Sequence, residues 1–286
     1  MATLRDVRRK IGSIQSTQTI TRTMRMVSAS KLRRAQEQLD KIKGYALNLD
    51  ELLKRVAARL PEGSHPLLTP REEVRNVLLF PIASDRGLSG AFNLNISTRV
   101  DNFIRENKQT YDKIGVYLVG RKIRDYLRKR RIQTTKELMD IKTISDDLVQ
   151  GIAGDLINLY LEGEFDRIYL IYTQFKSPIK QEVIFEEFIP VKVPQTEETI
   201  DYLYEPGKEE IIERLVPHYV STKIFYALTQ SQTSEHAARM AAMENATSNC
   251  GEMINYLTLV YNKTRQESIT AEMMDIVGGA EALQGE

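Results

Sequence analysis

The stretch KLRRAQEQLDKIKGYALNLDELLKRVAARL, residues 31–60, carries apolar side chains at alternating intervals of three and four residues. These positions are Leu32, Ala35, Leu39, Ile42, Ala46, Leu49, Leu53, Val56 and Leu60. A repeat of 3.5 residues keeps one apolar stripe facing a partner helix, so it predicts a left-handed coiled coil. The pattern then ends at Pro61, Gly63, Pro66 and Pro70.

The same spacing begins near the N-terminus, at Leu4, Val7, Ile11 and Ile14. Thr3 and Asp6 have the spacing of a capping box, with Asp in place of the usual Glu or Gln. A helix that continued to residue 60 would be about 85 Å long. It is too long to lie inside a compact domain of this size, and we expect it to project.

A polar interval interrupts the apolar stripe, because its seam positions hold Gln18, Thr21, Arg25 and Ser28. The apolar residues there, Ile20, Met24 and Val27, lie on a shifted stripe. Two interpretations stay open at this point. The interval is either a stutter that local unwinding absorbs or a contact surface for another protein.

The period changes between about residues 75 and 195. Short β-branched or aromatic runs at 77–82, 114–119 and 168–173 predict strands, and the segments 92–107, 121–131 and 146–162 predict helices between them. This alternation indicates a Rossmann-like α/β domain with a parallel sheet. The segment 181–193, which contains Pro190, is predicted to be a further strand at an edge.

A second long helix follows an acidic linker over 197–210. Pro206 is suited to a first helical turn, Pro217 is expected to kink or restart the helix, and 219–277 predicts about 90 Å of helix. Gly278 and Gly279 are expected to end it. The two long helices match in length, so we expect them to pair antiparallel. The predicted organisation is an N-terminal coiled-coil helix (1–60), a central α/β domain with linkers (61–205) and a C-terminal coiled-coil helix (206–286).

The second helix changes character along its length. It first carries a belt of small residues, Ala227, Ser231, Ser234, Ala237, Ala238, Ala241, Ala242, Ala246 and Thr247. Further on it is apolar on more than one face, at Met253, Ile254, Tyr256, Leu257, Leu259, Val260 and Tyr261. Such a surface would aggregate without a partner. We expect another subunit to enclose this end.

Composition limits the function classes. No apolar run approaches the roughly 20 residues of a membrane helix, and the N-terminus has no signal-peptide pattern, so we expect a protein inside a bacterial-type cell with at most peripheral membrane contact. Forty basic and 39 acidic residues give a net charge of +1, which argues against a protein built wholly for polyanions. The single cysteine, Cys250, cannot form an intrachain disulfide.

No catalytic motif emerges from the sequence. The turn SDRGLSG, residues 84–90, stands where phosphate-binding loops occur, but it lacks the Walker and dinucleotide spacings. A tight turn that exposes Asp85 and Arg86 is the favoured interpretation. The three histidines have no partner spacing suited to zinc, and no nucleophile elbow is present. We therefore expect no catalytic residue, cofactor or metal, although a nucleotide-binding enzyme built on the α/β domain is one alternative.

Basic residues concentrate in two stretches. One comprises Arg5, Arg8, Arg9, Lys10, Arg22, Arg25, Lys31, Arg33 and Arg34, and the other is the segment 121–131 with seven basic residues. Nucleic-acid binding is the sharp alternative, but no aromatic ladder accompanies either stretch. A solvated face, or one that meets acidic loops of a partner, explains them equally well.

Three blocks carry a family resemblance. They are SIQSTQTITRTMRMVSASKL (13–32), SDRGLSG (84–90), and SEHAARM (234–240) with LTLVYN (257–262), ITAE (269–272) and Gly279-Ala280. Together they resemble the signature of the γ subunit of F-type ATP synthases, with Ser89 where the family has Cys. The cysteine-bearing insertion of chloroplast relatives is absent, so thiol regulation is not expected.

The resemblance implies a non-catalytic rotor shaft, one copy per complex. In this family the antiparallel coiled coil stands inside a ring of alternating α and β subunits, and the α/β domain lies on the membrane c-ring beside the ε subunit. Proton flow turns the ring, and the shaft drives each β site through its affinity states. The implied location is the cytoplasmic face of a bacterial cell membrane, peripheral, without membrane insertion and without nucleic acid.

The resemblance also assigns contact residues. Met24 and Arg25 match the stretch near the β lever loops, and Arg86 matches the arginine of the turn that reaches a β subunit.

In the second long helix, Arg265 and Gln266 match the pair that hydrogen-bonds a β catch loop. Arg239, Thr270 and Glu272 match positions tied to coupling.

Overall fold

A computed structural model describes residues 3–57, 64–192, 205 and 207–284. The chain divides into two units, one of residues 28–239 and one that combines 1–27 with 240–286. The expectations for Leu60, Pro61, Gly63 and Pro206 fall outside the described residues. The proposed domain limits at 60 and 205 stay a prediction.

Helix α1 runs from Leu4 to Ala57, 54 residues without a break. The predicted capping box is present, because the Asp6 amide donates to Thr3 Oγ1 (3.3 Å) and the Thr3 amide donates to Asp6 Oδ2 (3.4 Å). These bonds satisfy two of the amides that every helix start leaves without a partner.

The predicted apolar seam faces a partner helix in the unit of residues 28–239. Its buried members are Leu32, Ala35, Leu39, Leu49, Leu53 and Val56, each at most 6% exposed. The partner is α5, which runs from Lys208 to Gln284. Polar side chains at the edge of this seam bond across it, with Tyr219 Oη donating to Asp50 Oδ1 at 3.1 Å and Tyr45 Oη 2.5 Å from His218 Nε2.

The polar interval of α1, except Ser28, belongs to the other unit, where it also faces α5. Arg25 pairs with Glu244, and Thr247 Oγ1 donates to Thr21 Oγ1 at 2.8 Å. Ile20 and Val27, on the shifted stripe, are 59% and 51% exposed. The spacing of three and four residues therefore continues unbroken through polar side chains that bond to the opposite helix. The stutter interpretation is wrong for this helix.

The pairing of the two long helices is antiparallel, since rising numbers on α1 meet falling numbers on α5 from Thr21–Thr247 to Arg25–Glu244. Gly251 of α5 lies opposite Gln18, where a Cβ atom would stand 3.3 Å from the amide nitrogen of that side chain.

The central sheet has five strands in the order β3-β2-β1-β4-β5. They are β1 (Asn76–Pro81), β2 (Lys113–Val119), β3 (Lys136–Leu138), β4 (Arg167–Phe175) and β5 (Gln181–Ile189). The first four are parallel and β5 is antiparallel to β4. The predicted parallel sheet and its edge strand before Pro190 are confirmed, and β3 is an addition.

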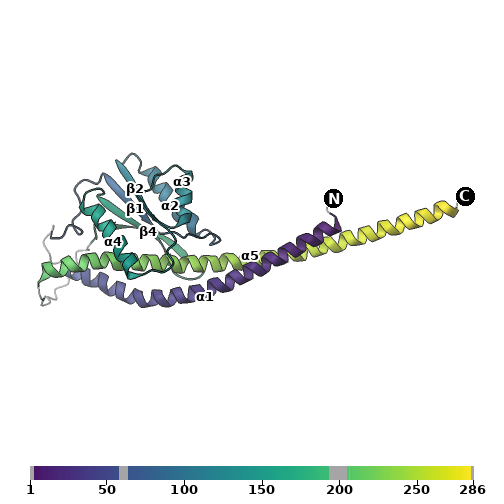
Figure 1. The fold of residues 1–286 in the computed structure, drawn as a ribbon, viewed down its shortest axis with the longest axis horizontal. Coiled ribbons are helices and arrows are strands. Elements are labelled where there is room, and N and C mark those ends of the chain that lie inside the picture. Colours follow the sequence, from purple (N-terminus) through teal and green to yellow (C-terminus); the bar gives the residue numbers. More distant parts are fainter. Residues whose placement is uncertain (1–2, 58–63, 193–204, 206, 285–286) are drawn as a thin grey trace. The chain divides into compact units, whose positions relative to one another are not determined.

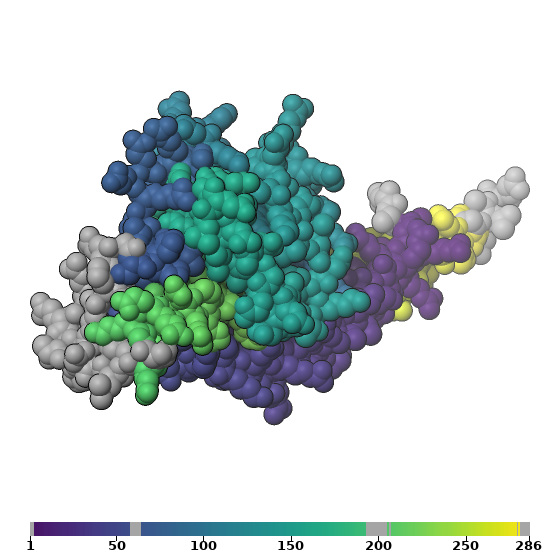
Figure 2. Space-filling model, turned by 60° about the vertical axis from the view of Figure 1, so that its left-hand side comes forward, coloured from purple at the N-terminus to yellow at the C-terminus, as the bar shows by residue number. Residues whose placement is uncertain are grey.

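Helices cover both faces of this sheet. On one face lie α2 (Phe92–Glu106) and α3 (Arg121–Lys129), and on the other lie α4 (Asp146–Leu161) and the first half of α5 (Figure 1). In the space-filling view the light-green first turns of α5 lie directly against the blue and teal atoms of the sheet domain (Figure 2). Within residues 28–239, the long helices and the α/β domain thus share one core.

Two expectations about α5 are wrong. Pro217 does not restart the helix, because it lies inside a single helix whose neighbouring Val216 and Val220 are fully buried. That burial offsets the one hydrogen bond a proline removes. A kink at Pro217 stays a prediction. Gly278 and Gly279 do not end the helix, which continues to Gln284. The residues that follow, Ala-Glu-Ala-Leu-Gln, are good helix formers.

Candidate partner-binding surfaces

Parallel α/β sheets bind ligands in the crevice where the strand order reverses, which here lies between the carboxyl ends of β1 and β4. Helix α5 fills this crevice. Ser231 Oγ accepts from the Thr173 amide (3.1 Å) and donates to the Ile82 carbonyl (3.3 Å), and Ser234 Oγ donates to the Thr173 carbonyl (3.0 Å). Both serines are at most 3% exposed.

A cavity of about 70 Å³ remains beside them, lined by Ser84, Asp85 and Glu235 among others. Ligand pockets usually occupy about 300–1,000 Å³, so a nucleotide in this crevice would have to displace α5. The first part of the small-residue belt therefore packs against the sheet of the same chain. Ala227 and Ala237, both fully buried, belong to it as well.

The turn at residues 84–90 is tight, as predicted. Ser84 Oγ donates to the Arg86 carbonyl (2.7 Å), and the Asn93 side chain bonds both the Ser84 amide (3.0 Å) and the Arg86 carbonyl (3.2 Å). Leu88 has φ of 61° and is 62% exposed. The turn presents the side chains of Arg86 and Leu88 to solvent.

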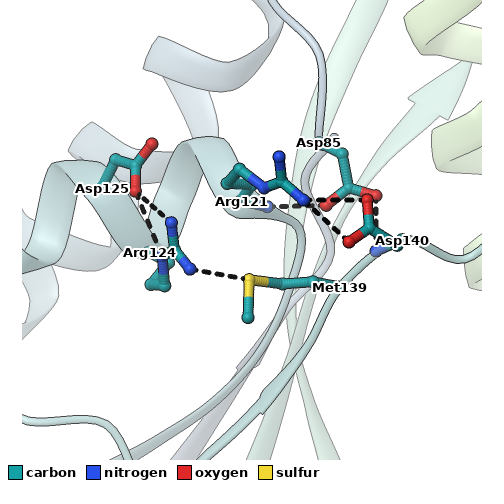
Figure 3. A network of polar contacts seen from close by, with 6 residues as sticks. All are labelled: Asp85, Arg121, Arg124, Asp125, Met139 and Asp140. Atoms are coloured by element: carbon teal, nitrogen blue, oxygen red, sulfur yellow. Dashed lines mark hydrogen bonds and ion pairs between the residues drawn. The ribbon is translucent and has the colours of Figure 1, made fainter.

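The expectation that Asp85 extends into solvent is wrong. Its carboxylate accepts from the backbone amides of Arg121 and Asp140, both at 2.9 Å (Figure 3). The Arg121 guanidinium in turn contacts the Asp140 carboxylate at 2.7 Å. A carboxylate at a helix start also interacts favourably with the helix dipole, so Asp85 fastens the turn to the N-terminus of α3 and to the loop after β3.

Arg239 fastens the same turn to α5. Its Nε and Nη2 donate to the Gly87 carbonyl (3.3 and 3.1 Å), and Nη2 donates to Glu235 Oε1 (2.7 Å). The two side chains are 10% and 17% exposed, and burial raises the pKa of Glu235 although the guanidinium opposes this shift. Glu235 was not among the expected site residues; its i, i+4 spacing to Arg239 was the available signal. A partner contact of Arg239 stays a prediction, since this structure uses its Nε and Nη2 within the chain.

Of the other predicted contact residues, Met24 is half-buried and Arg25 forms the ion pair with Glu244, its side chain 39% exposed. An ion pair with this much exposure contributes roughly 0–1 kcal/mol. Arg25 can therefore exchange Glu244 for a carboxylate of another protein at little cost.

The remaining four predicted residues, Arg265, Gln266, Thr270 and Glu272, are all exposed on the last third of α5. Large apolar side chains surround them: Ile269, Met273, Met274, Ile276 and Val277, each at least 49% exposed. Figure 1 shows that these turns of α5 continue past the N-terminal end of α1, which would otherwise cover one face. This end of the helix is an unpartnered surface of mixed polar and apolar character.

The histidines are used in different ways. His65 Nδ1 accepts from the Leu67 amide (3.1 Å), while His236 Nδ1 is buried without a hydrogen-bond partner and burial lowers the pKa of His236 to about 4. Within the described ranges, no three His, Cys, Asp or Glu side chains are arranged to hold a metal ion. No helix in that part of the chain is long and apolar enough to cross a membrane.

The basic segment around α3 is partly neutralised inside the chain. Arg121 pairs with Asp140, and Arg124 pairs with Asp125 at 2.7 Å (Figure 3). Arg130 pairs with Asp101 at 2.8 Å. These ion pairs favour a structural explanation for much of this charge over a nucleic-acid-binding face.

Comparison with known proteins gives the family. A family model described as ATP synthase matches residues 3–283, and an ATP synthase gamma chain of Anaeromyxobacter sp. (strain Fw109-5) is 43% identical over 99% of this chain and 100% of its own length. The chain belongs to the ATP synthase γ chain family. A second γ chain, from Bdellovibrio bacteriovorus, is 41% identical over the full length of both proteins.

Solved structures agree with this assignment. The central stalk and c-ring structure of the Tetrahymena thermophila mitochondrial ATP synthase contains a chain that is 26% identical, with a TM-score of 0.61 over 79% of this chain and 99% of that one. A chain of the Euglena gracilis mitochondrial ATP synthase has a TM-score of 0.68 over 98% of this chain and 94% of that one. At 20% identity the latter shows the fold alone.

Proposed function

We propose that this γ chain is the central rotor shaft of a proton-translocating F-type ATP synthase, which couples rotation of a membrane c-ring to the conformational cycle of catalytic β subunits. Its partners would be the α and β subunits of a hexameric ring, the ε subunit and the c-ring, with one γ chain per complex. The chain itself would be non-catalytic and peripheral, at the cytoplasmic face of a bacterial cell membrane.

One observation carries the proposal beyond family membership. Every described residue from Ile269 to Gly278 is exposed, although five of them are large and apolar. A surface of this kind needs a partner that encloses it. A ring of subunits around the end of α5 would supply that enclosure.

Coupling requires contacts that differ between orientations of the shaft, because a contact of equal strength in all states shifts no equilibrium. Charged and amide groups of the shaft can supply this difference, since their hydrogen bonds are directional and strengthened by charge. Arg265 and Gln266 are exposed neighbours on α5 and free to meet one β subunit at a time.

The Arg265→Ala/Gln266→Ala double variant tests this assignment. In inverted membrane vesicles that contain the assembled enzyme, we expect fewer protons pumped per ATP hydrolysed than in the wild type. Asn262→Ala/Lys263→Ala changes two exposed residues one turn earlier on the same helix and should leave this ratio unchanged. Full pumping by the first variant would remove both residues from the coupling mechanism.

A rotation assay tests the rotor itself. Ile179, 94% exposed in the connection between β4 and β5, accepts a probe as Ile179→Cys once Cys250 is changed to serine. With α and β subunits immobilised, we expect ATP to drive stepwise rotation of the probe. A complex that hydrolyses ATP while the probe stays fixed would overturn the proposal.

A further inference from the structure

A groove of about 560 Å³ lies where the C-terminal ends of α2 and α3 approach the start of β2, away from the turn at residues 84–90. Its apolar lining comes from Ile104, Ile114, Ile132 and Tyr111, all half-buried. Its charged lining comes from Arg105, Lys108, Arg130, Arg131, Asp101 and Asp112. The four cations and two carboxylates leave an excess of positive charge around an apolar floor.

Asp101 holds two of the cations in place. Its carboxylate, 3% exposed, accepts from Arg130 Nε at 2.8 Å and from both Nε and Nη2 of Arg105. Arg130 also stacks on the Tyr126 ring, with its guanidinium carbon 3.7 Å from the ring centre. The Arg105 and Arg130 side chains are still 66% and 40% exposed. A buried carboxylate therefore orients two guanidinium groups whose remaining donors face the groove, as a preorganised anion site requires.

The third arginine occupies an unusual backbone position. Helix α3 ends in a Schellman motif, because the Arg131 amide donates to the Arg128 carbonyl (3.1 Å) and the Ile132 amide to the Leu127 carbonyl (3.2 Å). Arg131, the residue that is usually glycine in this motif, has φ of 58°. Cations complement the negative end of a helix, but Arg128 and Lys129 already do so. A left-handed backbone conformation costs free energy for a residue other than glycine. An arginine kept at this position therefore indicates a function for its side chain.

We infer that this groove is a docking site for an acidic segment of another protein, whose carboxylates meet Arg105, Arg130 and Arg131 and whose apolar side chain fills the floor. The charge excess selects an acidic partner, and the apolar lining favours a peptide segment over a free anion. The groove volume corresponds to the size of a small ligand or of a few side chains. This inference does not depend on the rotor proposal.

Lysine reactivity tests the inference on the complex in which the chain is purified. Lys108 lines the groove, whereas Lys129 is also exposed, on α3, but does not line it. In the complex we expect acetylation of Lys108 to slow at least tenfold relative to the isolated chain, with Lys129 within twofold. A zero-length carbodiimide should join Lys108 to an Asp or Glu of another protein. Equal reactivity of Lys108 in both samples would overturn the inference, and so would protection that nuclease or delipidation abolishes.

Arg131→Gly separates docking from folding. Glycine fits the left-handed position better, so the variant chain should be at least as stable as the wild type, yet we expect the Lys108 crosslink to fall severalfold. Arg128→Gly, a charge removal of equal size outside the groove, should leave the crosslink unchanged. A crosslink that survives Arg131→Gly would show that Arg131 serves only the helix end. Stepwise rotation in the assay described above would be unaffected by either result, which keeps the two proposals distinguishable.

Discussion

Removal of the Arg239 side chain should substantially lower the free energy of unfolding, because it breaks a largely buried ion pair. This side chain is 10% exposed and bonds the Gly87 carbonyl and Glu235. Arg239→Ala would leave a carboxylate that is 17% exposed without its cation, and a turn carbonyl without its donor. Breaking a buried pair from one side costs about 3–5 kcal/mol. We expect a loss near the lower limit, because Glu235, whose pKa burial already raises, can take up a proton.

The assay is urea unfolding of the full chain at pH 7, followed by near-ultraviolet circular dichroism of its tyrosines. Arg214→Ala is the matched control, because Arg214 pairs with Glu210 on the same helix at the same i, i+4 spacing but is 82% exposed. It should cost less than about 0.5 kcal/mol. Glu235→Gln added to Arg239→Ala should recover part of the loss. If the two single variants lose equal stability, or the double variant recovers none, the reasoning from burial is refuted.

Three further outcomes follow from buried groups. His236 has a pKa of about 4 in the folded chain and 6.5 when unfolded, so the unfolded state binds more protons. The free energy of unfolding should therefore fall by up to about 2.5 kcal/mol as pH drops from 6.5 to 4. His236→Gln should flatten that slope in urea titrations at several pH values. Gly120→Ala would set a Cβ 2.6 Å from the Ala83 carbonyl oxygen at φ of 104° and should cost more than about 3 kcal/mol, whereas Gly154→Ala, with open space in α4, should stabilise by about 0.5–1 kcal/mol. Leu53 lies at a seam position and is 2% exposed, so Leu53→Ala should lower the free energy of unfolding by about 2–5 kcal/mol in thermal unfolding. The neighbouring Leu52 is 47% exposed, and Leu52→Ala should cost less than about 1 kcal/mol.

The long elements could be predicted because their patterns are periodic and their burial is one-sided or complete. Leu32 to Val56 repeats often enough to fix both a helix and its buried stripe, and the strand core at 77–80 is fully buried on both faces, which produces a continuous apolar run. Strand β3 escaped prediction because its three residues, Lys-Glu-Leu, are mostly exposed and have no apolar run.

The polar contacts could not be predicted, because they join residues far apart in the chain through backbone groups. Asp85 accepts from amides 36 and 55 residues away, and no spacing within the turn signals either one. The sequence pattern shows the small-residue belt of α5, but it does not show that the sheet of the same chain packs against it. Short side chains indicate close approach without saying whether the approaching surface is the chain's own sheet or another protein.

Ser231 and Ser234 give that close approach a mechanical meaning. Long charged side chains would let a helix swivel against a sheet, because four or five rotatable bonds can adjust while the contact persists. A serine hydroxyl sits one bond from its Cβ, so its bonds to the Ile82 and Thr173 backbone break as soon as the helix turns by a small angle. The α/β domain and this part of α5 should therefore twist as one stiff body, and torque applied to the domain would pass into the helix with little elastic loss.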